Sequence, residues 1–218
     1  MNRALILGCS HAAGSEIAQD PTILSSKIDD PETFERFRSY PSKIAAGLGY
    51  MVDNQAIPGG SNDSIFRLYE ASRLSPGDIV IACWTGINRT ELFHDNKWWP
   101  LAPGFQGAIV HHEFQKQWLT YNTDKEVGRQ NKIKNILALN ALAESRGIRV
   151  INIDSFWTTE RMRWPKNIHW AAFQSFVEYC EDRNFAKTPN GHYFLNAHQS
   201  FADFILANFL HSTIESLK

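Results

Sequence analysis

Four short strand candidates, separated by stretches with helical patterning, constrain the fold of this chain most. Three of them are apolar runs, at residues 4–8, 79–84 and 148–153, and the other spans residues 50–56. The first has no alternation of apolar and polar residues, which is typical of a strand buried on both faces of a parallel sheet. The sequence therefore predicts four strands whose order along the chain leaves room for crossover helices.

The segments between the strands predict these helices. The clearest has Ile133, Ile136 and Leu139 at helical spacing and closes at Gly147. Four other helices are expected: one at 43–48, one that begins after a cap at Ser61 or Asn62, one around 170–180 and one from about 196 to 214. The polar residues 19–41 are expected to form surface excursions. Alternating strands and helices predict an α/β fold, a three-layer sandwich around a mainly parallel central sheet.

Length and composition restrict the kind of protein. The 218 residues suit a single domain, 1–218, with an aromatic-rich excursion at about 89–126. A formal net charge of −1 gives no electrostatic reason to expect a nucleic-acid or membrane partner. No run of about 20 apolar residues exists to span a bilayer, and the apolar stretch near the start is too short for a signal peptide, so a cytoplasmic protein is expected. The sequence leaves the oligomeric state open.

Cysteine and histidine spacing argues against metal and disulfide chemistry. Cys9, Cys83 and Cys180 are odd in number and far apart, so we expect buried, reduced thiols. The adjacent pair His111–His112 would point in different directions on a regular element and makes a poor ligand pair. The sequence predicts no metal and no cofactor.

Four candidate site residues stand after the first three predicted strands or just before the last helix, where a parallel sheet places its ligand crevice. They are Ser10, Gly59, Asn88 and His192. Singly, each has a simple structural interpretation: a helix cap for the serine, turns for the glycine and asparagine, a partly exposed side chain for the histidine. Because all four residues are expected at the same edge of the sheet, they suggest a catalytic site instead. Ser10 would be the nucleophile, Gly59 and Asn88 the oxyanion donors, and His192 the general base.

The order Ser, Gly, Asn, His resembles the SGNH, or GDSL-type, hydrolase superfamily. The resemblance spans the chain: Gly-x-Ser-x-x-x-Gly at 8–14, the glycine block at 54–59, Gly-Ile-Asn at 86–88, and the block that carries His192, with His198 six residues later at the start of the closing helix. It implies a flavodoxin-like α/β fold and hydrolysis of an ester through an acyl-serine.

The resemblance also implies roles for these residues. Ser10 would attack the carbonyl and His192 would act as base, while the backbone N–H groups of Ser10 and Gly59 and the Asn88 side chain would hold the oxyanion. The chain departs from the family in having Cys9 before the serine and Asn190 where an aspartate usually precedes the histidine.

Asn190 is the departure with consequences for catalysis. Its oxygen can accept a hydrogen bond from His192, but it carries no charge to stabilise an imidazolium. Asp154, at the end of the fourth strand, and Asp182 are the other carboxylates considered for this place. Asn190 also keeps open the alternative of a catalytically weak or inactive protein that binds ligand, and an acyltransferase would use the same residues.

Five further residues are expected to contact substrate: His11, Trp84, Arg89, Trp98 and Trp99. Arg89 could meet a carboxylate or phosphate, or could form a structural ion pair with Glu91. The tryptophans of the excursion could stack on a sugar or shield an acyl chain, or could pack the excursion onto the domain. The predicted partner is a small-molecule or carbohydrate ester, which the protein would cleave as an esterase.

Overall fold

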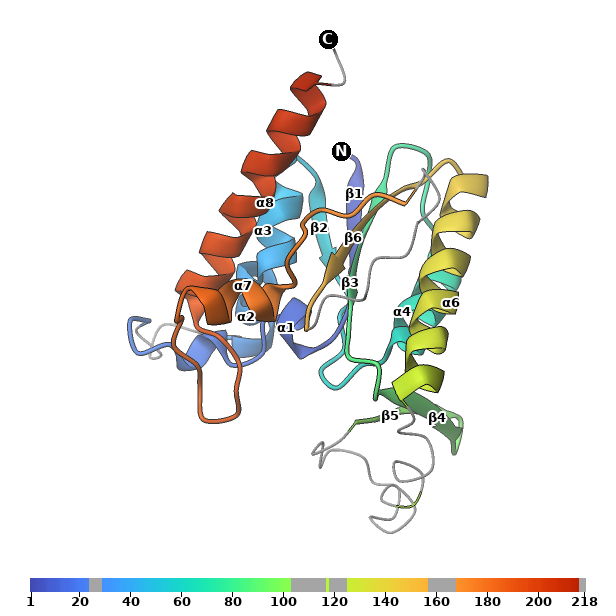
Figure 1. Cartoon of the computed structure of the whole chain (residues 1–218), viewed down its shortest axis with the longest axis horizontal. Coiled ribbons are helices and arrows are strands. Elements are labelled where there is room, and N and C mark those ends of the chain that lie inside the picture. Colours follow the sequence, from blue (N-terminus) through green and yellow to red (C-terminus); the bar gives the residue numbers. More distant parts are fainter. Residues whose placement is uncertain (24–28, 103–116, 118–124, 157–167, 216–218) are drawn as a thin grey trace.

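The computed structural model describes residues 1–23, 29–102, 117, 125–156 and 168–215. A four-stranded sheet lies between helices, and a two-stranded hairpin stands apart from it (Figure 1). In chain order the elements are β1 (Arg3–Leu7), α1 (Ser10–Ala13), the 3-10 helix η1 (Ile17–Gln19), α2 (Pro31–Arg38), α3 (Tyr40–Gly47), β2 (Met51–Asn54), α4 (Asn62–Glu70), β3 (Ile79–Trp84), β4 (Thr90–His94), β5 (Lys97–Leu101), α6 (Lys125–Ser145), β6 (Arg149–Asp154), α7 (Phe176–Asp182) and α8 (Leu195–Glu215).

The four strands of the main sheet are all parallel and lie in the order β2–β1–β3–β6. β1 is therefore an inner strand, with Leu5 paired to Asp53 on β2 and to Val80 on β3. Every residue of β3 is buried, as expected for a strand covered on both faces. The prediction of a mainly parallel α/β sheet is confirmed.

Helices cover both faces of this sheet, which gives the three layers predicted from the sequence (Figure 1). α3 and α8 pack together on one face with α2 and α7, and α4 packs with α6 on the other. Successive side chains of a strand point to opposite faces. Ile6 therefore lies in the core under α3 and α8, whereas Leu5 lies in the core under α4 and α6.

Helix α2 was not predicted, because residues 19–41 were expected to be surface excursions. The helix has no fully buried side chain, so hydrophobic periodicity gives little signal for it. Its start carries a different signal: Asp30 caps the helix by accepting a hydrogen bond from the Thr33 N–H at 3.2 Å, and Pro31 occupies the first turn. At the end of the segment Tyr40 is fully buried, which also corrects the expectation of a surface position.

The described part of the aromatic-rich excursion forms the antiparallel hairpin β4–β5. Asp95 and Asn96 make its two-residue turn with φ of 49° and 58°. Asp and Asn tolerate this left-handed conformation, which matches the twist of a tight hairpin. Residues 103–116 and 118–124 of the excursion lie outside the described residues.

Two further observations concern predictions made above. All three cysteines are buried and free, as predicted. Among the helices that the structure describes, none combines the length and the apolar character needed to cross a bilayer.

Candidate active site

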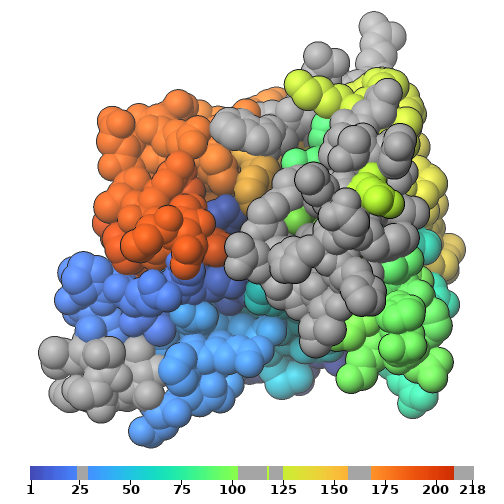
Figure 2. Space-filling model, turned by 90° about the horizontal axis from the view of Figure 1, so that it is seen from below, coloured from blue at the N-terminus to red at the C-terminus, as the bar shows by residue number. Residues whose placement is uncertain are grey.

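The strand order places a crevice at the carboxyl end of the inner strands. From β1 the chain passes through α3 to the outer strand β2, and from β2 it returns through α4 to β3 on the other side of β1. Connections that leave in opposite directions open a gap between the loops after β1 and β3. Figure 2 views the molecule toward this end, and it shows the blue N-terminal and orange C-terminal parts of the chain side by side.

Ser10 stands directly after β1, at the first residue of the short helix α1. Gly8 fits the preceding turn because an added Cβ would lie 2.6 Å from the Ala12 Cβ and 2.8 Å from the Cys83 Cβ. The helix ends after one turn at Gly14, whose φ of 79° favours glycine. The Ser10 hydroxyl makes no hydrogen bond with any described residue and is therefore free to turn toward a ligand.

Ser10 lines a cavity of about 410 Å³ together with residues from both ends of the chain. The described lining residues are Ser10, His11, Ser15, Glu16, Pro58, Gly59, Arg89, Ala102, Phe156, Asn190, Gly191 and His192. Six of the residues predicted to form the site thus lie together: Ser10, His11, Gly59, Arg89, Asn190 and His192.

His192 faces a carboxylate that the sequence did not point to. Its Nδ1 lies 3.1 Å from Oε2 of Glu16, and both side chains are largely buried, at 20% and 15% exposure. The ring N–H is not aligned for a straight hydrogen bond, so the contact acts through charge and proximity. Glu16 therefore occupies the position expected for Asn190.

Asn190 instead holds Glu16 in place. Its amide nitrogen donates to Oε1 of Glu16 at 2.5 Å, and the Thr188 hydroxyl donates to Oε2. The Thr188 hydroxyl oxygen in turn accepts the backbone N–H of His192 at 3.1 Å. The loop before α8 thus binds the carboxylate through two side chains and presents the histidine to it.

The carboxylate of Glu16 is kept ionised by these contacts. Partial burial by itself raises the pKa of Glu16, but the polar contacts from Thr188, Asn190 and His192 outweigh burial. The net result is a pKa below the ordinary value of 4.5. The backbone at Glu16 has a φ of 70°, an uncommon conformation for a non-glycine residue, and it costs about 1–3 kcal/mol.

Two backbone N–H groups border the cavity near the serine. Ser10 begins α1, so its N–H has no acceptor inside the helix. Gly59 is buried with a φ of 75°, and its N–H donates to no described carbonyl. Asn88, predicted as the third oxyanion donor, is exposed and lines a neighbouring cavity of about 720 Å³, so the structure separates it from the other two.

His11 and His198 are both held as neutral rings. His11 contacts the rings of Phe156 and His192 at centroid distances of 4.9 and 5.2 Å. Burial, and then the charge of His192, lowers the pKa of His11 well below 6.5. Burial likewise lowers the pKa of His198 to about 3, and its Nδ1 accepts the Tyr40 backbone N–H at 3.1 Å. His198 is thus a structural residue at the start of α8, as expected.

The tryptophans predicted to contact substrate lie elsewhere. Trp84 is fully buried and its indole N–H donates to Asn152 at 2.9 Å, so the expectation of a substrate contact is corrected. Trp98 lies under the Arg67 guanidinium at 4.9 Å and lines the neighbouring cavity. Trp99 donates to the His94 carbonyl within the hairpin. Trp84 thus packs in the core and Trp99 contacts its own hairpin, whereas Trp98 is 46% exposed at the neighbouring cavity.

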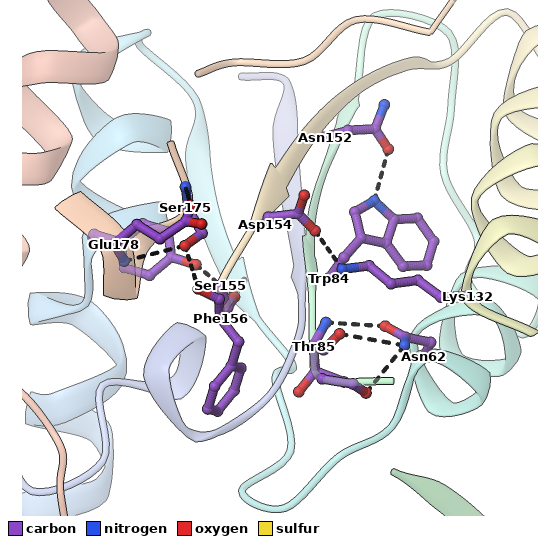
Figure 3. Close-up of polar contacts among 12 residues, drawn as sticks. Asn62, Trp84, Thr85, Lys132, Asn152, Asp154, Ser155, Phe156, Ser175 and Glu178 are labelled. Atoms are coloured by element: carbon purple, nitrogen blue, oxygen red, sulfur yellow. Dashed lines mark hydrogen bonds and ion pairs between the residues drawn. The ribbon is translucent and has the colours of Figure 1, made fainter. Parts of the chain in front are cut away.

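Asp154 and Asp182, the other carboxylates considered, do not line the cavity. Asp154 accepts from Lys132 at 2.5 Å in an ion pair that is almost completely buried (Figure 3). Asp182 accepts from the Gln174 amide. Among the described residues no cluster of three His, Cys, Asp or Glu side chains is arranged to hold a metal ion.

The loop after β3 is fixed independently of the hairpin. The Thr85 N–H donates to Oδ1 of Asn62 at 2.9 Å, and Figure 3 shows this contact between β3 and the start of α4. Ser61 caps α4 by accepting the Ser64 N–H while the Ser64 hydroxyl accepts the Ser61 N–H. The walls of the cavity are therefore anchored at their base by capped helices and buried polar contacts.

A parallel sheet with a serine after its first strand and a histidine before its last helix defines the class of SGNH, or GDSL-type, hydrolase folds. A solved structure of a G-D-S-L family protein from Desulfitobacterium hafniense DCB-2 is similar, with a TM-score of 0.55 and 15% identity over 95% of this chain and 99% of that chain. A carbohydrate esterase described as having divergent catalytic and non-catalytic binding functions has a TM-score of 0.50 and 12% identity, over 96% of this chain and 68% of that chain.

No protein-family model and no curated protein sequence matches this chain. The similarity to the solved structures concerns the fold, and at that level the resemblance predicted from the sequence is confirmed. This chain has the SGNH/GDSL hydrolase fold.

Proposed function

We propose that this protein is a serine hydrolase that cleaves carboxylic esters through an acyl-serine. The observation that carries the proposal is the convergence on one cavity of Ser10, His192 and a carboxylate, Glu16, 3.1 Å from the histidine ring. A nucleophile, a base and a group that orients the base are the three roles that acyl transfer by serine requires.

In the proposed reaction Ser10 Oγ attacks the ester carbonyl carbon while His192 takes the hydroxyl proton on Nε2, the ring nitrogen remote from Glu16. The tetrahedral intermediate collapses, and the leaving alcohol takes the proton from His192. Water then attacks the acyl-serine while His192 takes a proton from it, and collapse of this second intermediate releases the carboxylic acid as His192 returns the proton to Ser10 Oγ. The N–H groups of Ser10 and Gly59 donate to the oxyanion, and the loss of one such donor typically costs about 3 kcal/mol.

Glu16 also bears on the alternative of a protein that only binds ligand. That alternative was favoured by Asn190, which lacks charge. Glu16 supplies a negative charge beside His192, and this supports turnover over mere binding. A carbohydrate as the alcohol gains no support from Trp98 and Trp99, because neither is among the described residues of the cavity.

The test is hydrolysis of 4-nitrophenyl acetate and butyrate by the purified protein and its Ser10→Ala and His192→Ala variants. We expect each variant to lose at least about 10³-fold in kcat, since nucleophile and base act as a unit. Ser145→Ala, on an exposed serine at the end of α6, is the matched control. Labelling with a fluorophosphonate, located by peptide mass spectrometry, should modify Ser10.

Equal rates for the wild type and both active-site variants would contradict the proposal. Addition of a small alcohol as a second acceptor separates hydrolysis from acyl transfer, because a transferase would form the new ester in preference to the free acid.

A further inference from the structure

Arg89 is the charged residue of the cavity that the proposed reaction does not use. It follows β3 and lines the cavity together with Ser10 and His192. Its guanidinium carbon lies 4.5 Å from the ring centroid of Phe156, which projects past the carboxyl end of β6 (Figure 3). This cation–π contact holds the guanidinium against the cavity wall.

The guanidinium of Arg89 has no anionic partner among the described residues. Its Nη1 atom is buried and makes no hydrogen bond. Arg67 nearby shows the contrast, since it binds Glu91 through two hydrogen bonds of 2.8 Å. An arginine is always charged, and a buried donor without an acceptor costs free energy, so Arg89 offers a ligand a donor that no described residue satisfies.

The cavity cannot supply that acceptor from its own described side chains. Glu16 is the one carboxylate among the described lining residues, and it is already occupied by Thr188, Asn190 and His192. Among the described lining residues, Arg89 is therefore a cation close to the proposed nucleophile without an anionic partner of its own. The planar guanidinium offers parallel donors whose spacing matches the two oxygens of a carboxylate.

We propose that Arg89 binds a carboxylate of the substrate, so that the preferred ester carries a second, negatively charged group near the scissile carbonyl. The inference rests on the proposed function and specifies its substrate class. The carboxylate belongs either to the acyl group or to the alcohol, and two pairs of substrates distinguish these sources.

The first pair is mono-4-nitrophenyl succinate and its methyl ester, which differ only in a charge on the acyl side. The second is 4-acetoxybenzoate and its methyl ester, which differ in a charge on the alcohol side. For one pair we expect the wild type to prefer the anionic member by about 10- to 100-fold in kcat/KM, mainly through KM, as is typical of a charge-assisted hydrogen bond.

Arg89→Gln should remove this preference, so that the ratio of kcat/KM for the anionic member to kcat/KM for the neutral member falls to about 1, because the variant can no longer bind the substrate's charge. Arg183→Gln is the matched control, because Arg183 also stacks on an aromatic ring, 3.8 Å from Tyr179, but lies away from the cavity. Equal kcat/KM for charged and neutral members of both pairs overturns the inference. An equal loss of kcat for both members in Arg89→Gln also overturns it and assigns Arg89 to the oxyanion.

Equilibrium binding separates failure of the inference from failure of the proposed function. Calorimetry with Ser10→Ala measures the affinity for each ester without turnover. Tighter binding of one anionic ester, lost in the Ser10→Ala, Arg89→Gln double variant, supports the carboxylate site even if the wild type hydrolyses no ester. Equal affinity for anionic and neutral esters overturns the site even if the wild type is an active esterase.

Discussion

Replacement of Glu16 by glutamine tests whether the carboxylate stabilises His192 during turnover. The substitution keeps the size of the side chain and its ability to accept from Thr188, but it removes the charge. The relevant distance is 3.1 Å between Oε2 of Glu16 and Nδ1 of His192, with the side chains 15% and 20% exposed. At an effective dielectric constant of about 40, chosen for this partial exposure, Coulomb's law gives about 2.7 kcal/mol for the pair with a protonated ring.

A barrier raised by about 2.7 kcal/mol corresponds to a loss of about 100-fold in kcat. The assay is steady-state hydrolysis of 4-nitrophenyl acetate between pH 5 and 8, with thermal unfolding measured in parallel. Because the pKa of Glu16 lies below 4.5, the carboxylate is charged throughout this range. The ratio of wild-type to variant kcat should therefore stay constant there and fall only at lower pH, as the wild-type carboxylate takes up its proton.

The matched control is Glu126→Gln, which removes an exposed carboxylate on α6. It should leave kcat unchanged. A Glu16→Gln variant that folds normally and retains kcat within about twofold of the wild type would refute the reasoning, because the Coulomb term would then be absent from the barrier.

Two other substitutions test how buried ionisable groups outside the reaction affect the stability of the fold. Burial, with the charge of His192 second, lowers the pKa of His198 to about 3, so between about pH 6.5 and 3 the unfolded chain binds a proton that the folded chain does not. Stability should be lost as pH falls through this window, by about 1.4 kcal/mol per unit for this group, and His198→Gln but not the exposed His94→Gln should flatten the slope in urea unfolding. Lys132→Met removes the ammonium group that pairs with buried Asp154 and should lower the free energy of unfolding by about 3–5 kcal/mol. Arg129→Ala, at an exposed ion pair, should lower it by less than about 1 kcal/mol. Similar urea midpoints for these two variants would contradict this account.

The local patterns of the sequence were sufficient for most of the sheet and its helices. The predicted strands at 4–8, 79–84 and 148–153 fall within one residue of β1, β3 and β6. They could be predicted because strands buried on both faces leave continuous apolar runs. α2 was missed because it buries no complete side chain, so only the cap at Asp30 marks it.

The edge of the sheet that carries the site was also predictable. Parallel strands all end at the same edge, so Ser10 after the first strand and Gly59 after the second had to lie near one another. Trp84 was misjudged because the last residue of a strand can point into the core as well as toward the crevice. The Trp84 side chain packs in the core cluster beneath α6, because it points to the face of the sheet that this helix covers.

The sequence by itself determined the α/β class, the order of the four sheet strands along the chain and the placement of a serine loop and a histidine loop at one edge of the sheet, because these follow from periodicity and from the geometry of parallel strands. The tertiary structure alone decided which acid faces His192. Glu16 and the loop that contains Thr188 and Asn190 come from opposite ends of the chain, and no spacing rule relates them. Their contact arises because the fold brings the segment after α1 and the loop before α8 to the same cavity, where the Asn190 amide and the Thr188 hydroxyl donate to the Glu16 carboxylate.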